Sequence, residues 1–236
     1  MVPAVLAIAS LLVPAVAKAP TASLHLKRHH RPGAPVFIVL QNVSDETLRF
    51  STPWTISETK TGQISATYHW KKGERTLAPD QTAIWEWDQR EGAHSTAPAP
   101  PEEAERVGPG GYVVTIETAG RTFTRRFHIG RFFTVGFEGR DATVTVFVNE
   151  RRQIDRMKAE AEAALEDKRF IVSGIVRGEK KFNEPWSYSM GPGSIVLAEV
   201  FVEVCDASPG YVERHQEDWL GKRWCPWSSY VLKTGR

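Results

Sequence analysis

The chain has 236 residues, of which 41% are hydrophobic and 25% are charged. This composition is close to that of an average globular protein and excludes a wholly disordered or collagen-like chain. Thirty Lys and Arg residues nearly cancel 28 Asp and Glu residues, so the formal net charge is only +2. Nucleic-acid-binding proteins usually carry a larger basic excess, and we therefore expect no nucleic-acid partner.

The first segment of the chain has the character of an export signal. Residues 1–17 carry no charged side chain and are almost entirely apolar or small. The apolar run 5–16 would span about 18 Å as a helix, short of a hydrocarbon core about 30 Å thick. Ala15-Val16-Ala17 is a small-x-small cleavage signature. We predict a signal peptide over residues 1–17, a secreted or periplasmic location and no integral membrane segment after cleavage. The alternative is a buried N-terminal strand or helix.

From residue 36 to 129 the sequence has a β pattern. Short apolar or alternating runs are separated by turn residues, and none has a helical period. The runs are 36–40, 48–50, 68–70, 84–87, 112–116 and 123–129. This pattern predicts an antiparallel β-sandwich over residues 24–130. The basic run 27–31 just before it is either a solvated edge or a binding patch.

One long connection interrupts the β pattern. Residues 91–111 read EGAHSTAPAPPEEAERVGPGG and show no apolar period. A connection this long is usually either disordered or functional, and both alternatives stay open. If it is functional, we expect it to bind a partner through its proline-rich and acidic centre, which consists of Pro98, Pro100, Pro101, Glu102 and Glu103.

The remainder of the chain mixes strands and helices. We predict strands over 143–148, 170–176 and 229–233, and a hairpin formed by 186–190 and 195–204. A helix is expected over 149–168 with Asn149 as its N-cap, and a second from Ser208 to about residue 219 with Pro209 in its first position. This order predicts a small α+β domain over residues 136–236, with its boundary near residues 130–136.

The two cysteines of the chain are Cys205 and Cys225. An even number in an exported protein suggests a disulfide, although two buried thiols in a cytosolic protein would fit the same count. Closing this loop would stabilise the fold by about 3 kcal/mol in the chain-entropy description. Two cysteines and the nearby His215 fall short of the four ligands of a structural zinc ion.

Catalytic motifs are not evident. The sequence contains no H-E-x-x-H, no G-x-S-x-G and no Gly-rich phosphate loop with a lysine. The histidines are scattered apart from one adjacent pair. We therefore predict a protein that is not an enzyme and needs neither a cofactor nor a metal.

Tryptophan is the other candidate signal. Trp85 and Trp87 are two residues apart on one expected strand, so both side chains lie on the same face. They either belong to the core or form an aromatic platform that binds a protein or a glycan. Trp224 and Trp227 lie beside Cys225, where indoles usually pack against a disulfide.

Two families resemble parts of this sequence. The stretches 77–82 (LAPDQT), 84–89 (IWEWDQ) and 108–114 (GPGGYVV) resemble the intracellular proteinase inhibitor (BsuPI-like) domain, over about residues 34–129. This resemblance implies an immunoglobulin-like fold and protease inhibition, with Asp80 standing where the family often has glycine.

The second resemblance covers about residues 142–234. It is carried by 170–176, 183–188, 203–207 and 224–229. These stretches resemble the N-terminal domain of a eukaryotic calmodulin-binding protein, a domain also found in bacterial secreted proteins. The resemblance supports the fold unit and the cysteine pair, whereas the acidic residues within 149–168 are unlike a calmodulin target.

Together these observations predict a secreted, non-enzymatic, two-domain binding protein. The N-terminal β-sandwich is expected to bind a protein partner, most concretely a protease, and the chain would then be a proteinase inhibitor. The alternative is a cell-surface glycan-binding or adhesion module.

Overall fold

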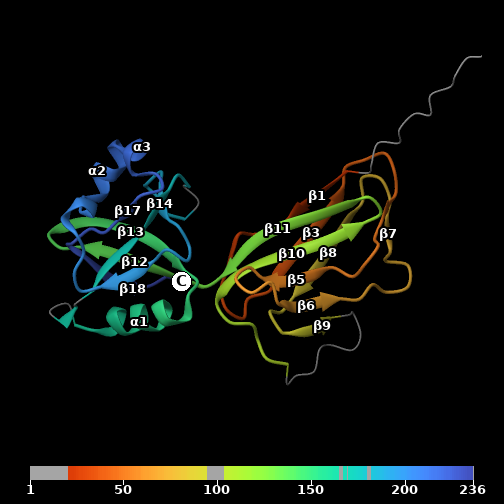
Figure 1. Ribbon diagram of the computed structural model, residues 1–236, viewed down its shortest axis with the longest axis horizontal. Coiled ribbons are helices and arrows are strands. Elements are labelled where there is room, and N and C mark those ends of the chain that lie inside the picture. Colours follow the sequence, from red (N-terminus) through yellow and green to blue (C-terminus); the bar gives the residue numbers. More distant parts are fainter. Residues whose placement is uncertain (1–20, 95–103, 165–166, 169, 180–181, 236) are drawn as a thin grey trace, which may run out of the picture.

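The computed structural model describes residues 21–94, 104–164, 167–168, 170–179 and 182–235. The predicted signal peptide and the five proline and glutamate residues at the centre of the 91–111 connection lie outside the described residues. Strands predominate, and the chain forms two lobes that lie side by side along its longest axis (Figure 1). Within the described part of the chain, no helix has the length and apolar character needed to cross a membrane.

The first lobe contains strands β1 to β11, which form two main sheets. One sheet has the order β1-β3-β8, and the other has the order β2-β11-β10-β5-β6-β9, while β4 and β7 form a separate pair. The bounds are β1 Ala22–His25, β2 His29–His30, β3 Val36–Asn42, β4 Leu48–Arg49, β5 Thr55–Glu58, β6 Ile64–Tyr68, β7 Thr76–Leu77, β8 Thr82–Trp87, β9 Gly92–His94, β10 Gly110–Thr118 and β11 Arg121–Ile129.

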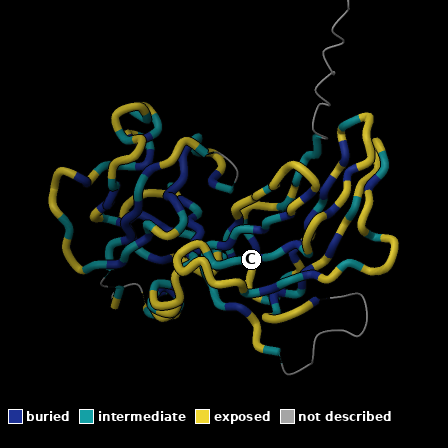
Figure 2. Tube along the Cα trace, turned by 45° about the vertical axis from the view of Figure 1, so that its right-hand side comes forward, coloured by how far each residue is buried: buried dark blue, intermediate teal, exposed yellow. Residues whose placement is uncertain are grey.

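Alternation along the strands places the core of this lobe between the two sheets. In β3, Val36, Ile38 and Leu40 are buried, whereas Phe37 between them is exposed. The strands of the other sheet contribute buried residues such as Val114 to the same hydrophobic cluster. Figure 2 shows buried positions following the strands in both lobes and exposed positions concentrated in the outer turns. The expected β-rich architecture is therefore confirmed.

The antiparallel expectation is wrong at two sheet edges. Strand β2 pairs in parallel with β11, and β9 pairs in parallel with β6. Strand β9 lies within the connection that we expected to be structureless. A bridge between Arg90 and Arg106, with Val107 N–H donating to the Gln89 carbonyl at 2.8 Å, closes the base of that connection. Backbone pairing at both ends of the connection thus needs no apolar period in its sequence.

The second lobe contains two further sheets and three α-helices. One sheet has the order β13-β12-β18, and in the other β14 pairs with β15, β16 and β17. The bounds are β12 Arg131–Phe137, β13 Arg140–Val148, α1 Arg151–Glu162, β14 Ile171–Arg177, β15 Ser189–Met190, β16 Val196–Ala198, the 3-10 helix η2 Glu203–Cys205, α2 Pro209–Arg214, α3 Gln216–Trp219, β17 Arg223–Trp224 and β18 Ser229–Thr234.

This lobe has its own hydrophobic cluster, separate from that of the first. It joins the buried faces of β12, β13, β14 and β18 to Ile154 and Met157 of α1. Burial of these two residues, three apart, fixes which face of α1 packs on the sheet. The opposite face is exposed.

Several expected elements of the second lobe differ in the structure. The stretch 130–136, expected to be a boundary, contains most of the central strand β12. Helix α1 is shorter than 149–168, and its N-cap is Glu150, whose side chain makes no cap hydrogen bond. The expected hairpin does not form, because β15 and β16 each pair with β14 and not with one another. The Ser208 cap is confirmed: its Oγ accepts from Tyr211 N–H, and Pro209 begins α2.

Gly130 is the turning point between the lobes. A Cβ at this position would lie 2.1 Å from the Val148 carbonyl oxygen. Its N–H donates to the His30 carbonyl at 2.9 Å. The chain therefore passes from β11 to β12 against the end of β13, a path that leaves no room for a side chain.

Candidate functional site

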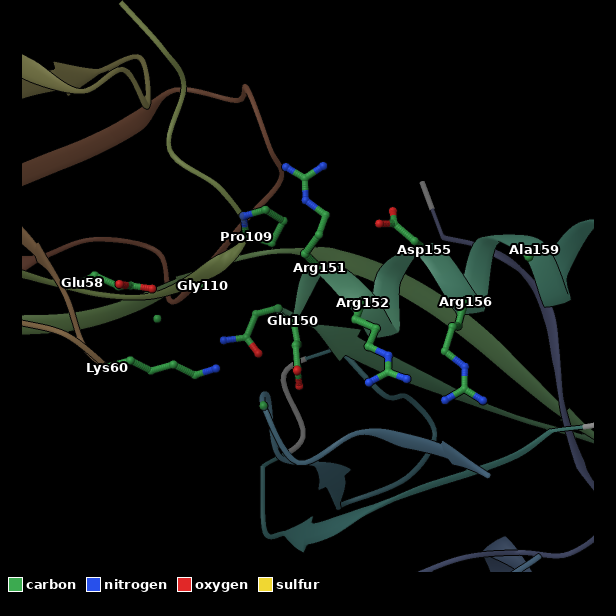
Figure 3. A pocket seen from close by; sticks show the side chains of 13 residues that line it. Glu58, Lys60, Pro109, Gly110, Glu150, Arg151, Arg152, Asp155, Arg156 and Ala159 are labelled. Atoms are coloured by element: carbon green, nitrogen blue, oxygen red, sulfur yellow. The ribbon is translucent and has the colours of Figure 1, made fainter. Parts of the chain in front are cut away.

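A cleft of about 840 Å³ lies where the two lobes meet (Figure 3). Its walls come from the end of β5 and the following turn, the start of β10, and the first two turns of α1. We call it the junction cleft. Its lining residues are Glu58, Lys60, Pro109, Gly110, Gly111, Asn149, Glu150, Arg151, Arg152, Asp155, Arg156, Ala159 and Gly193.

Charged side chains dominate this lining. Four are cationic, from Lys60 and three arginines of α1, and three are acidic, so the formal charge of the lining is +1. Figure 3 shows Arg152 and Arg156 extending from the same side of α1, one turn apart. The Arg156 guanidinium is fixed, because it donates to the Leu197 carbonyl at 3.2 Å and lies 4.4 Å from the centre of the Phe170 ring.

The other two arginines have no comparable structural role. Arg151 and Arg152 are exposed and occupy the first two positions of α1, where they form no ion pair with any described residue. A cation at a helix N-terminus opposes the helix macrodipole, at a cost of about 0.3–1 kcal/mol. The first N–H groups of a helix also lack intrahelical acceptors. The start of α1 therefore presents a concentrated positive potential to the cleft that folding does not require.

The wall opposite α1 is held by the loop before β10. The Tyr112 hydroxyl donates to the Gly108 carbonyl at 2.7 Å. Burial, with smaller contributions from Glu58 and Glu91, raises the pKa of Tyr112 to about 12. The hydroxyl thus stays protonated at neutral pH and keeps the Gly108–Pro109 turn in place.

Polar contacts tie the lobes together beside the cleft. Asn149 lies 3.1 Å from His128, with its side-chain N–H₂ donating to Nδ1 of the ring. Burial, and next the positive charge of Arg28, lowers the pKa of His128, which favours the neutral ring that can accept this bond. Arg28 in turn forms an ion pair with Glu179 of the second lobe. Asn149 therefore joins the lobes and does not serve as the helix cap that we predicted.

The two candidate tryptophans on β8 are core residues. Trp85 is 7% exposed and Trp87 is 0% exposed. The Trp87 Nε1–H donates to the Arg90 carbonyl at 2.8 Å, and the Trp85 ring packs among those of Phe50, Tyr68 and Trp70. The platform alternative is therefore wrong for this pair, because the inward face of β8 is covered by the opposing sheet. The other candidate binding residues, Pro98 to Glu103, lie outside the described residues.

The cysteines form the expected disulfide, with 5.2 Å between the Cα atoms of Cys205 and Cys225. Backbone pairing supports it, since Cys225 N–H donates to the Cys205 carbonyl at 2.8 Å. Trp224 beside it is buried, and its Nε1–H donates to the Ala207 carbonyl at 2.9 Å. Trp227, by contrast, is 42% exposed. The disulfide and Trp224 therefore serve the fold of the second lobe.

The residues of the junction cleft are not among those that the sequence pattern singled out. One signal for them was present: two adjacent arginines with no acidic residue in the first turn of an expected helix. Among the described side chains, no group of three or more His, Cys, Asp or Glu residues could hold a metal ion.

Comparison with known families supports the expectation for the second half of the chain. The sequence model of the N-terminal domain of calmodulin-binding protein 74 matches residues 130–235. This match begins at the turning point Gly130 and includes β12, so it extends the resemblance predicted from residue 142. The resemblance of residues 34–129 to the BsuPI-like domain stays a prediction.

Comparisons with individual proteins add little. No curated protein matches the sequence. Among solved structures, the alkylpurine DNA glycosylase AlkC of Pseudomonas fluorescens, bound to DNA containing an abasic site analog, matches with 14% identity and a TM-score of 0.27. The match covers 46% of this chain and 30% of the glycosylase chain. A similarity at this level supports no inference about fold or function.

Proposed function

We propose that this protein is an exported, non-enzymatic binding protein that recognises a protein partner through the junction cleft. We further propose that its two hydrophobic cores belong to two domains, an immunoglobulin-like sandwich and a small α+β domain. The observation that carries the proposal is the pair Arg151 and Arg152. These exposed cations oppose the dipole of α1, form no ion pair with a described residue, and line a cleft.

The chemistry of the cleft favours a peptide segment with an isolated carboxylate. A guanidinium binds a carboxylate through two parallel hydrogen bonds, and the free N–H groups of α1 favour the same charge. The acidic lining residues Glu58, Glu150 and Asp155 disfavour a second nearby anion. A polypeptide loop with one Asp or Glu among neutral or basic residues matches this arrangement better than a uniformly anionic polymer does.

A secreted protease is the first partner class to test. The BsuPI-like resemblance of residues 34–129 favours it, and an inhibitor needs only a preorganised surface and no catalytic group. The Tyr112 hydrogen bond and the packing of α1 on its sheet supply that preorganisation.

The experiment is a binding screen with two charge-reversal variants. The full chain is titrated against a panel of secreted proteases and used to select from a library of displayed peptides. The test variant is Arg151→Glu/Arg152→Glu, and the matched control is Lys71→Glu/Lys72→Glu, an exposed pair outside the cleft. We expect the wild type and the control to select Asp- or Glu-containing peptides, and the test variant to bind them at least about tenfold more weakly, because two guanidinium contacts to the carboxylate are lost.

The fold of the test variant provides an internal check. Glutamates in the first turn favour the helix dipole, so the free energy of unfolding should stay equal or rise by about 0.5–2 kcal/mol. Weaker binding therefore cannot be attributed to unfolding. Equal peptide binding by the test variant and the wild type would refute the cleft as the binding surface. If no protease of the panel loses activity at micromolar concentrations of the chain, the inhibitor role is refuted.

A further inference from the structure

A second charged surface lies on the first lobe, away from the residues that line the junction cleft. It surrounds a hollow of about 590 Å³. We call it the basic patch and define it by Lys27, Arg28, Arg125 and Arg126. The hollow is completed by Leu26, His29, Phe132 and Phe182, so none of its lining residues is acidic.

The tertiary structure creates this patch from two distant parts of the sequence. Strand β2 pairs in parallel with β11, which places His29 opposite His128. The His128 N–H donates to the Arg28 carbonyl at 2.8 Å. This pairing brings the Lys27-Arg28 dipeptide beside the Arg125-Arg126 dipeptide. A short basic run that could have been a solvated edge thus becomes half of a four-cation cluster.

The charge of the patch is largely uncompensated. Arg28 pairs with Glu179, but Lys27, Arg125 and Arg126 form no ion pair among the described residues. Four cations around one hollow repel one another and raise the local potential. A bound polyanion would relieve this repulsion, whereas the described part of the fold provides a single carboxylate.

Aromatic rings form the floor between these cations. The ring centres of His29 and Phe182 are 5.1 Å apart, and those of Phe132 and Phe182 are 5.3 Å apart. Both phenylalanines are only partly buried and line the hollow. An apolar floor with charged groups at its rim suits a ligand that combines C–H surfaces with anionic substituents, as sugar rings with sulfate or carboxylate groups do.

We infer that the basic patch binds an anionic polysaccharide. Guanidinium groups pair with sulfates or carboxylates through two hydrogen bonds, and the rings contact the sugar carbons. A nucleic acid is the less favoured polyanion. The whole chain carries a formal charge of only +2, whereas nucleic-acid-binding domains typically have a strong overall basic excess. This site is independent of the junction cleft.

Heparin serves as the probe for the test. Binding of the full chain to a heparin oligosaccharide is measured by titration at several NaCl concentrations. The test variant is Arg125→Ser/Arg126→Ser, and the matched control is the adjacent exposed pair Lys71→Ser/Lys72→Ser. We expect the test variant to bind at least about tenfold more weakly with a shallower salt dependence, because fewer ion contacts form. The control should bind within about twofold of the wild type, because its lysines lie outside the patch.

Further variants distinguish this site from the cleft and from a folding defect. Arg151→Glu/Arg152→Glu should retain heparin binding, whatever the outcome of the peptide screen. Lys27→Ser should weaken it severalfold, and all variants should melt as the wild type does, since the altered side chains are not part of either core. Absence of heparin binding by the wild type at low salt, or equal binding by the Arg125/Arg126 variant, overturns the proposal. Tighter binding to a DNA duplex than to heparin overturns the choice of polysaccharide.

Discussion

At the scale of single residues, the largest side chains of the first lobe have a structural role. Trp54 and Trp87 are completely buried, and both pack against other aromatic rings. An indole that is removed from water and packed on all sides contributes more to stability than an average core residue does. We therefore expect these tryptophans to be far more important for folding than for binding.

Replacing Trp87 by alanine should lower the free energy of unfolding by about 3–5 kcal/mol, because it removes a buried ring and leaves a cavity. It also leaves the Arg90 carbonyl without the indole N–H donor. Denaturant unfolding followed by circular dichroism measures this loss. The matched control is Trp227→Ala, which truncates an indole that is 42% exposed and should cost much less. Equal losses for the two variants would mean that the burial of Trp87 is incorrect.

At the scale of elements, the region from β16 to β17 depends on a covalent link. Only the three-residue η2 and the short helices α2 and α3 are regular there, and Val200, Val202 and Val204 are all exposed. Short elements of this kind bury little apolar surface. The disulfide spans a sequence separation of 20 residues and joins η2 to the end of β17.

Removing the disulfide through Cys205→Ser/Cys225→Ser should lower the free energy of unfolding by about 3 kcal/mol, the loop entropy that the bond removes from the unfolded chain. Chemical denaturation measures the loss. A reducing agent should destabilise the wild type by a similar amount and leave the double variant unchanged. Indifference of the wild type to reduction would show that the bond does not stabilise the fold.

At the scale of the whole molecule, buried histidines accompany the contact between the lobes. Burial lowers the pKa of both His30 and His128 below the usual 6.5. His30 bonds to the Lys27 carbonyl at 2.8 Å, and His128 bonds to Asn149 across the junction. The unfolded chain therefore binds more protons than the folded chain does at mildly acidic pH.

Stability should consequently rise with pH in the window between the lowered folded-state pKa values and about 6.5, and fall as the solution is acidified through it. Each histidine contributes at most about 1.4 kcal/mol per pH unit. Unfolding free energies measured from mildly acidic to neutral pH should show this slope. It should flatten in His30→Gln/His128→Gln and persist in the control His25→Gln, which alters an exposed histidine. A slope unchanged in the double variant would exclude these histidines as its source.

Much of the fold could be predicted from local patterns. Period-two alternation identified β3, β8, β10 and β11, because alternate side chains of these strands face one core. Ser208 and Pro209 marked the start of α2, because a cap depends on adjacent residues alone. The cysteine pair was predicted from number and context. The resemblance of the second half to the N-terminal domain of a calmodulin-binding protein was also present in the sequence, although its start at residue 130 was not.

The tertiary structure decided what depended on distant partners. The sequence of β12 did not reveal a central strand, and β15 and β16 were expected to pair because β14 between them was not foreseen. The two binding surfaces have the same origin. Arg151 and Arg152 became cleft residues only when α1 met the start of β10, and Lys27 joined Arg125 only through the parallel pairing of β2 with β11. Local sequence determines which residues can be buried or capped, whereas the convergence of like charges is a property of packing.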